Sequence, residues 1–319
     1  MRAAYVEQLG GVDEIRVGEL PDPVAGPGEV LVDVVATSAN PVDTFVRSGL
    51  YVTPVPLPLV LGRDVVGRVV ADAAGFRAGE WVWSNSLGHG GRQGAAAERA
   101  VVPAERLYRL PEGADPFDVV VMVHPGATAY LALVTHGRVR AGETVLVAGG
   151  GGNVGAALIE LAAAAGARVI ATASADDLDR CRALGATEVF DYRDPGLADR
   201  LAAAGAVDVF VDTSGRNDLE AAVGLLAERG RIVVLAGARS RPVLPAGELY
   251  MHDRSVLGFA ISNARAEELA EAAVSLNDRF AHGGLRPHHV ERRTLADAAE
   301  THRRLEQGAV RGRVVLVVS

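Results

Sequence analysis

The spacing of apolar positions changes along the chain near residue 120. Before this point, short apolar runs alternate with clusters of glycine and proline, a pattern that predicts an antiparallel barrel or sandwich. After it, short and almost continuously apolar runs alternate with stretches in which apolar residues recur at helical spacing. Such continuous runs predict strands that are covered on both faces. The alternation of strand and helix therefore predicts a doubly wound parallel sheet.

The expected elements can be given by their residue ranges. Strands of the first region cover 29–36, 65–71, 80–83 and 98–102, and those of the second cover 144–148, 168–172, 187–190, 207–212, 231–236 and 255–260. Helices are expected at 153–165, 176–184, 195–204 and 217–228, followed by Gly166, Gly185, Gly205 and Gly230, where a helix cap needs a left-handed residue. Further helices are expected near 265–280 and 295–306, and the run 313–318 is typical of a strand that returns to a sheet.

Composition excludes several classes of function. A chain of 319 residues favours two domains, and 49% apolar with 23% charged residues is typical of a globular protein. The net charge of −8 argues against a nucleic-acid partner, and the absence of lysine, with all 32 cations arginine, excludes Schiff-base chemistry. The single cysteine, Cys181, excludes an internal disulfide and a cysteine-based zinc site, and it suits the cytoplasm. Without an apolar run of 18 residues, we expect no membrane span.

The most informative motif is a glycine-rich turn between a predicted strand and a predicted helix. Gly150, Gly152 and Gly155 satisfy the pattern G-x-G-x-x-G. In such a turn the first glycine permits a tight bend, the second lets a pyrophosphate approach the backbone, and the third lets the helix lie close to the strand. The N–H groups at the helix start then face the phosphates. The motif predicts a dinucleotide site.

The end of the second strand bears on the choice of cofactor. NAD-binding proteins usually carry Asp or Glu there, but residues 171–174 contain no acid, so a 2′-phosphate would be tolerated. Arg180 and Arg193 could pair with that phosphate, whereas the nearby Asp176 and Asp177 would repel it. The pattern favours NADPH over NADH.

Several segments carry a resemblance to a known family; they are 39–51, 61–70, 125–130, 150–155, 191–194, 236–240 and 308–318. In this order they resemble the zinc-free, zeta-crystallin-like quinone oxidoreductases of the medium-chain dehydrogenase/reductase superfamily. The resemblance implies an α/β protein with a GroES-like β-barrel catalytic domain at 1–121 and 262–319. It also implies an NADP-binding Rossmann domain at 122–261 and a cofactor in the cleft between the domains. Members are often homodimers or homotetramers that pair through the Rossmann edge strand, here about 255–261.

The resemblance also bears on metal. Zinc-dependent alcohol dehydrogenases of the superfamily carry ligands at positions that here read Gly62-Arg63-Asp64 and Pro41-Val42-Asp43. The eight histidines form no recognisable ligand set. We therefore expect no zinc, and catalysis by positioning of the acceptor and by a hydrogen-bond or proton donor.

The family pattern assigns roles to individual residues. Tyr51 is the first candidate for the proton donor, and Asn40 and Asp43 are candidates for ordering the site; the alternatives are a packed barrel aromatic and turn chemistry around Pro41. The remaining candidates would bind the cofactor: Thr128, Phe259 and Ile261 at the nicotinamide, Gly150, Gly151, Gly152, Asn153, Val154 and Gly155 at the pyrophosphate, Ser174, Tyr192 and Arg193 at the adenosine, and Ala236, Gly237 and Arg239 after the fifth strand.

These observations lead to one expected function and two alternatives. The chain is expected to be a zinc-independent, NADPH-dependent reductase of quinones or related conjugated carbonyls. The first alternative is an enoyl or enone reductase that acts on a carbon–carbon double bond. The second is a protein that binds NADPH without turnover, as a sensor or structural component. The expected partner is a small molecule, with neither nucleic acid nor membrane involved.

Overall fold

A computed structural model describes residues 1–318 and divides them into two compact units. Unit 1 contains residues 1–124 and 265–318, and unit 2 contains Pro125–Ala264. The chain passes from the first unit to the second inside helix α2 (Pro116–Tyr130), which continues as the π-helical segment η3 (Leu131–His136). It returns just after the short helix η5 (Ile261–Asn263).

Unit 1 is built on antiparallel strands, as the glycine- and proline-punctuated pattern predicts. A three-stranded sheet has the order β2-β1-β4, and a larger sheet has the order β15-β16-β3-β5-β6-β8, with β7 also paired to β3. The strands are β1 (Arg2–Val6), β2 (Arg16–Glu19), β3 (Glu29–Ala39), β4 (Leu59–Val60), β5 (Val65–Val69), β6 (Trp81–Ser84), β7 (Arg99–Pro103), β8 (Tyr108–Arg109), β15 (Val290–Thr294) and β16 (Arg313–Val317). The helices are α1 (Pro41–Arg47), α8 (Ala266–Ala281) and α9 (Ala298–Glu306), with short turns η1 (Val12–Glu14), η2 (Ala104–Arg106) and η6 (Leu295–Asp297).

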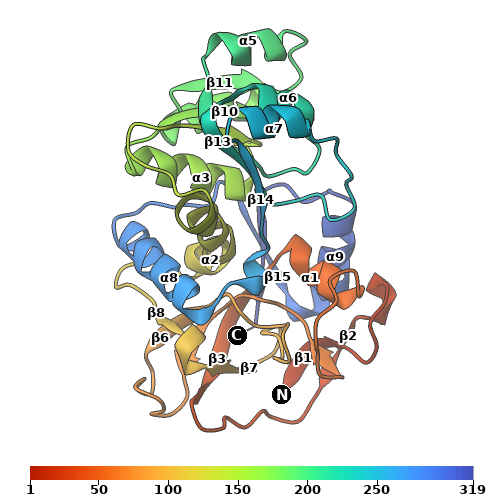
Figure 1. The fold of residues 1–319 in the computed structure, drawn as a ribbon. Helices are drawn as coiled ribbons and strands as arrows, with labels where there is room; N and C mark the ends of the chain where they lie inside the picture. Colours follow the sequence, from red (N-terminus) through yellow and green to blue (C-terminus); the bar gives the residue numbers. More distant parts are fainter. Residues whose placement is uncertain (319) are drawn as a thin grey trace. The chain divides into compact units, whose positions relative to one another are not determined.

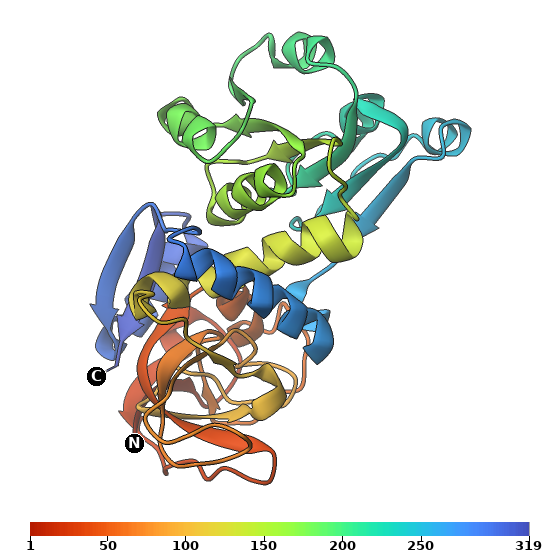
Figure 2. The same ribbon diagram turned by 90° about the vertical axis from the view of Figure 1, so that its left-hand side faces the viewer.

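The end of the chain completes the larger sheet of unit 1. Strand β16 pairs antiparallel with β3 and parallel with β15. Figure 2 shows these dark-blue strands beside the red strands from the other end of the chain. The predicted return of residues 313–318 to a sheet is confirmed, and the partner is a strand of unit 1.

Unit 2 contains a parallel sheet of six strands in the order β11-β10-β9-β12-β13-β14. This is the order of a doubly wound dinucleotide-binding fold, in which all strands are parallel and the strand order reverses between β9 and β12. The strands are β9 (Thr144–Ala148), β10 (Arg168–Ala173), β11 (Glu188–Asp191), β12 (Val207–Asp212), β13 (Leu226–Val234) and β14 (Ser255–Gly258). The helices are α3 (Asn153–Ala164), η4 (Ala175–Asp177), α4 (Leu178–Ala183), α5 (Leu197–Ala203), α6 (Leu219–Gly224) and α7 (Ala246–Met251).

Both faces of this sheet are covered, which explains the continuous apolar runs. On one face, Leu146, Ile170, Phe210 and Ile232 pack with residues of α5 and α6. Helix α3 contacts β9 and β10, and Figure 1 shows α3 and α6 on opposite sides of the strands. The expected α/β fold class, a GroES-like barrel unit with a Rossmann sheet, is confirmed.

One predicted helix and its cap are wrong. The helix expected at 217–228 covers only Leu219–Gly224, and β13 already begins at Leu226. Gly230 is not a left-handed cap, unlike Gly166, Gly185 and Gly205, which have positive φ. It lies inside β13 near a register shift, where a Cβ would come within 2.9 Å of the Leu226 side chain. The glycine therefore serves a close approach within a bulged strand.

The sequence patterns missed helix α2 and its continuation, because Pro125 lies inside the helix and looks like a break. In residues 1–318, Pro116–His136 is the one helical segment long and apolar enough to cross a membrane by length and composition. Of its most apolar window, 72% is buried in the structure, which is typical of a core helix.

Candidate functional site

The glycine loop in unit 2 is shaped by contacts that leave no room for a side chain at Gly150 and Gly155. A Cβ on Gly150 would lie 2.9 Å from the Ile159 side chain and 3.1 Å from Cys181 Sγ. A Cβ on Gly155 would overlap the carbonyl oxygen of Gly149, so helix α3 can approach the loop only with glycine there. At Gly152 the nearest atom to such a Cβ is 3.4 Å away. The cradle therefore fits the backbone approach of a pyrophosphate.

Helix α3 opens directly from this loop. Gly152 is its N-cap residue, with extended backbone, and the helix continues through Asn153, Val154 and Gly155. The N–H groups of a first helical turn have no carbonyl partners within the helix, and the helix dipole adds positive potential there. The end of α3 is therefore suited to bind phosphate oxygens.

The predicted adenosine residues come together beside this loop. Ser174 directly follows β10, and the backbone N–H of Tyr192 donates to the Ala173 carbonyl at 3.1 Å. The Arg193 guanidinium lies over the Tyr192 ring, 5.1 Å from its centroid. Arg180, on α4, donates to the carbonyl oxygen of Gly151. These residues line the carboxyl end of β10, where the sequence predicts the adenosine ribose.

Two further loops meet at the carboxyl ends of β12 and β13. A Cβ on Gly215 would overlap the backbone of Gly237, so the two loops touch through glycine. Asp212 is buried and its Oδ1 accepts from the backbone N–H groups of Ser214 at 3.0 Å and Gly215 at 2.9 Å. Sequence reasoning missed this loop, although the polar residues after the apolar strand 207–212 were the available signal.

The remaining predicted cofactor residues are more scattered. Ala236 is half-buried next to Gly237, whereas Arg239 is exposed on the same loop. Thr128 is a half-buried residue of α2. Two more follow β14: Phe259 stacks on His136, with 4.2 Å between ring centroids, and Ile261 is buried.

In unit 1, Asn40 and Asp43 belong to a buried network of polar side chains. The side chain of Asn40 donates from Nδ2 to Asp64 Oδ2 at 2.8 Å and accepts at Oδ1 from Arg313 at 2.7 Å. Arg313 also donates to Ser38, whose hydroxyl is bonded to Asp64. Both ends of the Asn40 amide are therefore engaged within the protein.

The environment of Asp43 changes its proton affinity. Burial, reinforced by the negative charge of Asp64, raises the pKa of Asp43 to about 7. The backbone N–H of Asn40, which donates to Asp43 at 2.8 Å, and the cations Arg63 and Arg313 oppose this rise. Burial also raises the pKa of Asp64. The network therefore contains the carboxyls of Asp43 and Asp64 beside the guanidinium groups of Arg63 and Arg313, and Asp43 exchanges its proton near neutral pH.

Tyr51 lies on the loop after α1, half-buried against an apolar cluster that includes Val46 and Leu59. Burial lowers the pKa of Arg63, and an electrostatic interaction with Tyr51 is among the smaller contributions that oppose this. Arg63 in turn donates to the Asn85 carbonyl at 3.1 Å and contacts His89 Nε2 at 3.3 Å. Asn40 and Asp43 therefore belong to one buried charge cluster, whose members Arg63, Asp64 and Arg313 the sequence did not reveal as partners, and Tyr51 interacts electrostatically with Arg63 of that cluster.

A divalent metal does not fit this cluster. Arg63 and Arg313 are buried beside the carboxyls of Asp43 and Asp64 and already balance their charge. Across residues 1–318, no three His, Cys, Asp or Glu side chains converge on a point that could hold a metal ion. His124 Nδ1 lies 3.8 Å from Asp64 Oδ1, and burial and the nearby arginines hold the pKa of His124 well below its usual value.

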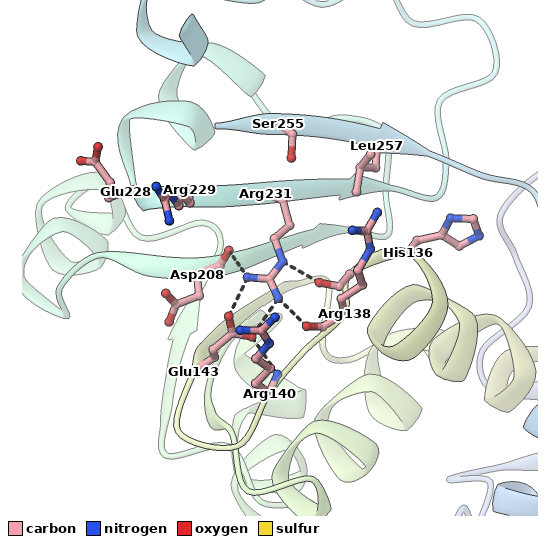
Figure 3. A pocket seen from close by; sticks show the side chains of 11 residues that line it. His136, Arg138, Arg140, Glu143, Asp208, Glu228, Arg229, Arg231, Ser255 and Leu257 are labelled. Carbon is pink, nitrogen blue, oxygen red and sulfur yellow. Dashed lines mark hydrogen bonds and ion pairs between the residues drawn. The ribbon is translucent and has the colours of Figure 1, made fainter. Parts of the chain in front are cut away.

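A cavity of about 610 Å³ lies at the opposite edge of the unit 2 sheet, where the strands begin. Figure 3 shows Arg231 at its centre, donating to both oxygens of Glu143 at 2.8 Å and to the carbonyls of Gly137, Arg138 and Asp208. The Arg231 bond lowers the pKa of Glu143. Because open α/β sheets bind ligands at the carboxyl ends of their strands, we interpret this network as a structural tie between η3 and β13.

Comparisons with known proteins agree with this arrangement. Residues 26–112 match the alcohol dehydrogenase GroES-like domain, and residues 153–277 match the domain described as zinc-binding dehydrogenase. The chain is 30% identical to the mouse quinone oxidoreductase (Mus musculus), covering 100% of this chain and 98% of that protein. The structure of Escherichia coli quinone oxidoreductase complexed with NADPH superposes with a TM-score of 0.85 at 26% identity, covering 99% of this chain and 100% of that one. A structure described as an NAD-dependent alcohol dehydrogenase superposes with a TM-score of 0.87 at 33% identity over 100% of both chains.

The two domain matches, the full-length similarity and the glycine cradle all point to the same assignment. The chain is an oxidoreductase and belongs to the quinone oxidoreductase family of the medium-chain dehydrogenase/reductase superfamily.

Proposed function

We propose that the chain is an NADPH-dependent reductase of quinones or related conjugated carbonyls, and that it works without zinc. The glycine cradle at the start of α3 carries the cofactor part of this proposal, since only glycine fits at Gly150 and Gly155. The relatives named quinone oxidoreductase, and the one solved with NADPH, support the choice of acceptor and cofactor.

Residues of unit 2 would bind the cofactor, and a residue of unit 1 would protonate the acceptor. The loop Gly150–Gly155 and the first turn of α3 would hold the pyrophosphate, and Ser174, Tyr192 and Arg193 would hold the adenosine. NADPH supplies the hydride when bound. Tyr51 is the proposed proton donor to the acceptor, with the Arg63 guanidinium stabilising negative charge nearby.

The buried network positions the segment that carries Tyr51. Asn40 precedes α1, and Arg313 and Asp64 fix its amide at both ends. We therefore propose Asn40 and Asp43 as positioning residues. The two guanidinium groups supply the positive charge that a metal would supply elsewhere in the superfamily, and this supports zinc independence.

Assembly and location complete the proposal. Strand β14 is the last strand of its sheet, and the nearby segment exposes large apolar side chains at Val243, Tyr250 and Met251. This supports a homodimer or homotetramer formed through β14, which sedimentation velocity measures directly. The buried single cysteine, Cys181, supports a place in the reducing cytoplasm.

The decisive experiment measures oxidation of NADPH at 340 nm with 1,4-benzoquinone, 9,10-phenanthrenequinone and a simple enone. We expect turnover with a quinone, and the same rate after prolonged treatment with 1,10-phenanthroline. Turnover of the enone alone would replace the proposal by an enone reductase. NADPH binding without any turnover would support a sensor instead, and a rate abolished by the chelator would refute zinc independence.

A further inference from the structure

An acidic side chain lies on the phosphate-binding loop of unit 2, although the strand before it ends without an acid. The carboxylate of Asp177 packs against Gly151, where a Cβ would come within 2.6 Å of its Oδ2. The Ser174 hydroxyl donates to the same oxygen at 2.8 Å. Ser174 is the first residue after β10, so the turn η4 returns the Asp177 side chain to the end of that strand.

Arg180, in the first turn of α4, pairs with Asp177. Its guanidinium donates to Asp177 Oδ1 at 3.0 Å and at 3.3 Å, and also to the Gly151 carbonyl. Asp177 and Arg180 keep side-chain exposures of 28% and 20%, so both groups remain accessible to a ligand. The pair therefore places one anion and one cation over the loop that receives the adenosine ribose.

The two nicotinamide cofactors differ at this ribose alone. NADH carries a 2′-hydroxyl, which donates well to a carboxylate. NADPH carries a 2′-phosphate, which a carboxylate repels and a guanidinium attracts. Arg180 uses Nε and Nη2 for Asp177 and Gly151, so a phosphate that binds its remaining N–H groups lies close to the Asp177 carboxylate, which repels it.

We infer that Asp177 and Arg180 together set the cofactor preference of this chain, and that NADH serves as a second cofactor beside NADPH. Asp177 accepts from the ribose hydroxyls of NADH, and Arg180 binds the 2′-phosphate of NADPH against the opposition of Asp177. This inference rests on the proposed function, and it develops the repulsion between Asp177 and a 2′-phosphate that the sequence already indicates.

The test measures dissociation constants by isothermal titration calorimetry, for NADH and NADPH and for 5′-AMP and adenosine 2′,5′-bisphosphate. Each pair differs only by the 2′-phosphate. Asp177→Asn should shift both ratios toward the phosphorylated ligand by about tenfold, the size expected for one nearby like charge. Arg180→Gln should shift both ratios the other way. Asp177→Ser, which removes the charge with a different side chain, should shift them in the same direction as Asp177→Asn.

Asp176→Asn is the matched control, because it removes the same charge from the neighbouring, exposed position. An equal shift for Asp176→Asn and Asp177→Asn would overturn the inference, as would NADH binding more than a hundredfold weaker than NADPH in the unmodified chain. In both cases NADPH still binds, and the proposed function stands. Failure of both dinucleotides to bind any variant would instead refute the proposed function itself.

Discussion

Replacing Arg313 by methionine should destabilise unit 1 strongly and in a pH-dependent way. The Arg313 side chain is buried, donates to Ser38 and Asn40, and lies 4.0 Å from Asp64 Oδ2. At an effective dielectric constant of about 20, one ion pair at this distance is worth roughly 4 kcal/mol. Breaking a buried pair by removing one partner costs about 3–5 kcal/mol, because the remaining charge stays desolvated. We expect a loss of about that size in the free energy of unfolding at pH 8.5.

The loss should be smaller at pH 5.5. Without Arg313, the folded-state pKa values of Asp43 and Asp64 rise further above their unfolded values. Carboxyls with raised folded-state pKa values favour the folded state at low pH, and this contribution disappears as pH rises through those values. Since the pKa of Asp43 is already about 7 in the unmodified chain, the difference between the two proteins should grow between pH 5.5 and 8.5.

Urea unfolding followed by tryptophan fluorescence measures this effect, because both tryptophans, Trp81 and Trp83, lie in β6 of unit 1. Arg311→Met is the matched control, since Arg311 is exposed two residues away. A loss below about 1 kcal/mol for Arg313→Met, a loss equal to that of the control, or a loss independent of pH would refute the reasoning.

Three further outcomes are expected. Tyr51→Phe should lower quinone turnover more than tenfold with unchanged NADPH affinity, because the phenol is the proposed proton donor. Tyr5→Phe in β1 should leave turnover unchanged. Equal rates for the two variants would show that Tyr51 is not the donor. Gly155→Ala should lower the free energy of unfolding of unit 2 by about 1–3 kcal/mol and weaken NADPH binding, because the added Cβ overlaps the Gly149 carbonyl. Gly152→Ala should leave the stability unchanged, and unfolding followed by circular dichroism distinguishes the two variants. Burial and the charge of Arg47 lower the pKa of His302 to about 3, so the stability that neutral His302 contributes is present above pH 6.5 and is lost as pH falls. Between pH 7.5 and 4.5, the free energy of unfolding of the unmodified chain should fall by roughly 2–3 kcal/mol more than that of His302→Gln. Equal losses in urea titrations of the two proteins would contradict this.

The nucleotide loop was predictable because its causes are local. Gly150, Gly152 and Gly155 lie within one strand–turn–helix segment, and steric contacts inside that segment fix their roles. The parallel sheet was predictable for a similar reason, because strands covered on both faces leave a continuous apolar signature. Even so, the sequence placed Gly230 at a helix end, where the structure has a bulged strand.

The buried network could not be found in this way. Asn40 and Arg313 are 273 residues apart in the chain, and an isolated arginine near a terminus is most often a solvated charge. The two adjacent charges at Arg63 and Asp64, inside an otherwise apolar run, were the available signal. Asp177 is a different case. The sequence places it near the ribose, but its contact with Gly151 depends on the turn η4, which the sequence did not predict.

The pairing of β16 with β3 determines the order in which the two units can fold during synthesis on the ribosome. All residues of unit 2 are synthesised before strand β16, so its six-stranded sheet can assemble while the chain is still growing. Unit 1 must wait, because β3 lacks its partner β16, and Asn40 and Asp64 lack the Arg313 cation, until residues 313–317 have emerged from the exit tunnel. The half that is translated first is therefore the half that matures last, and during that interval its unpaired strand edge stays open to pairing with other chains.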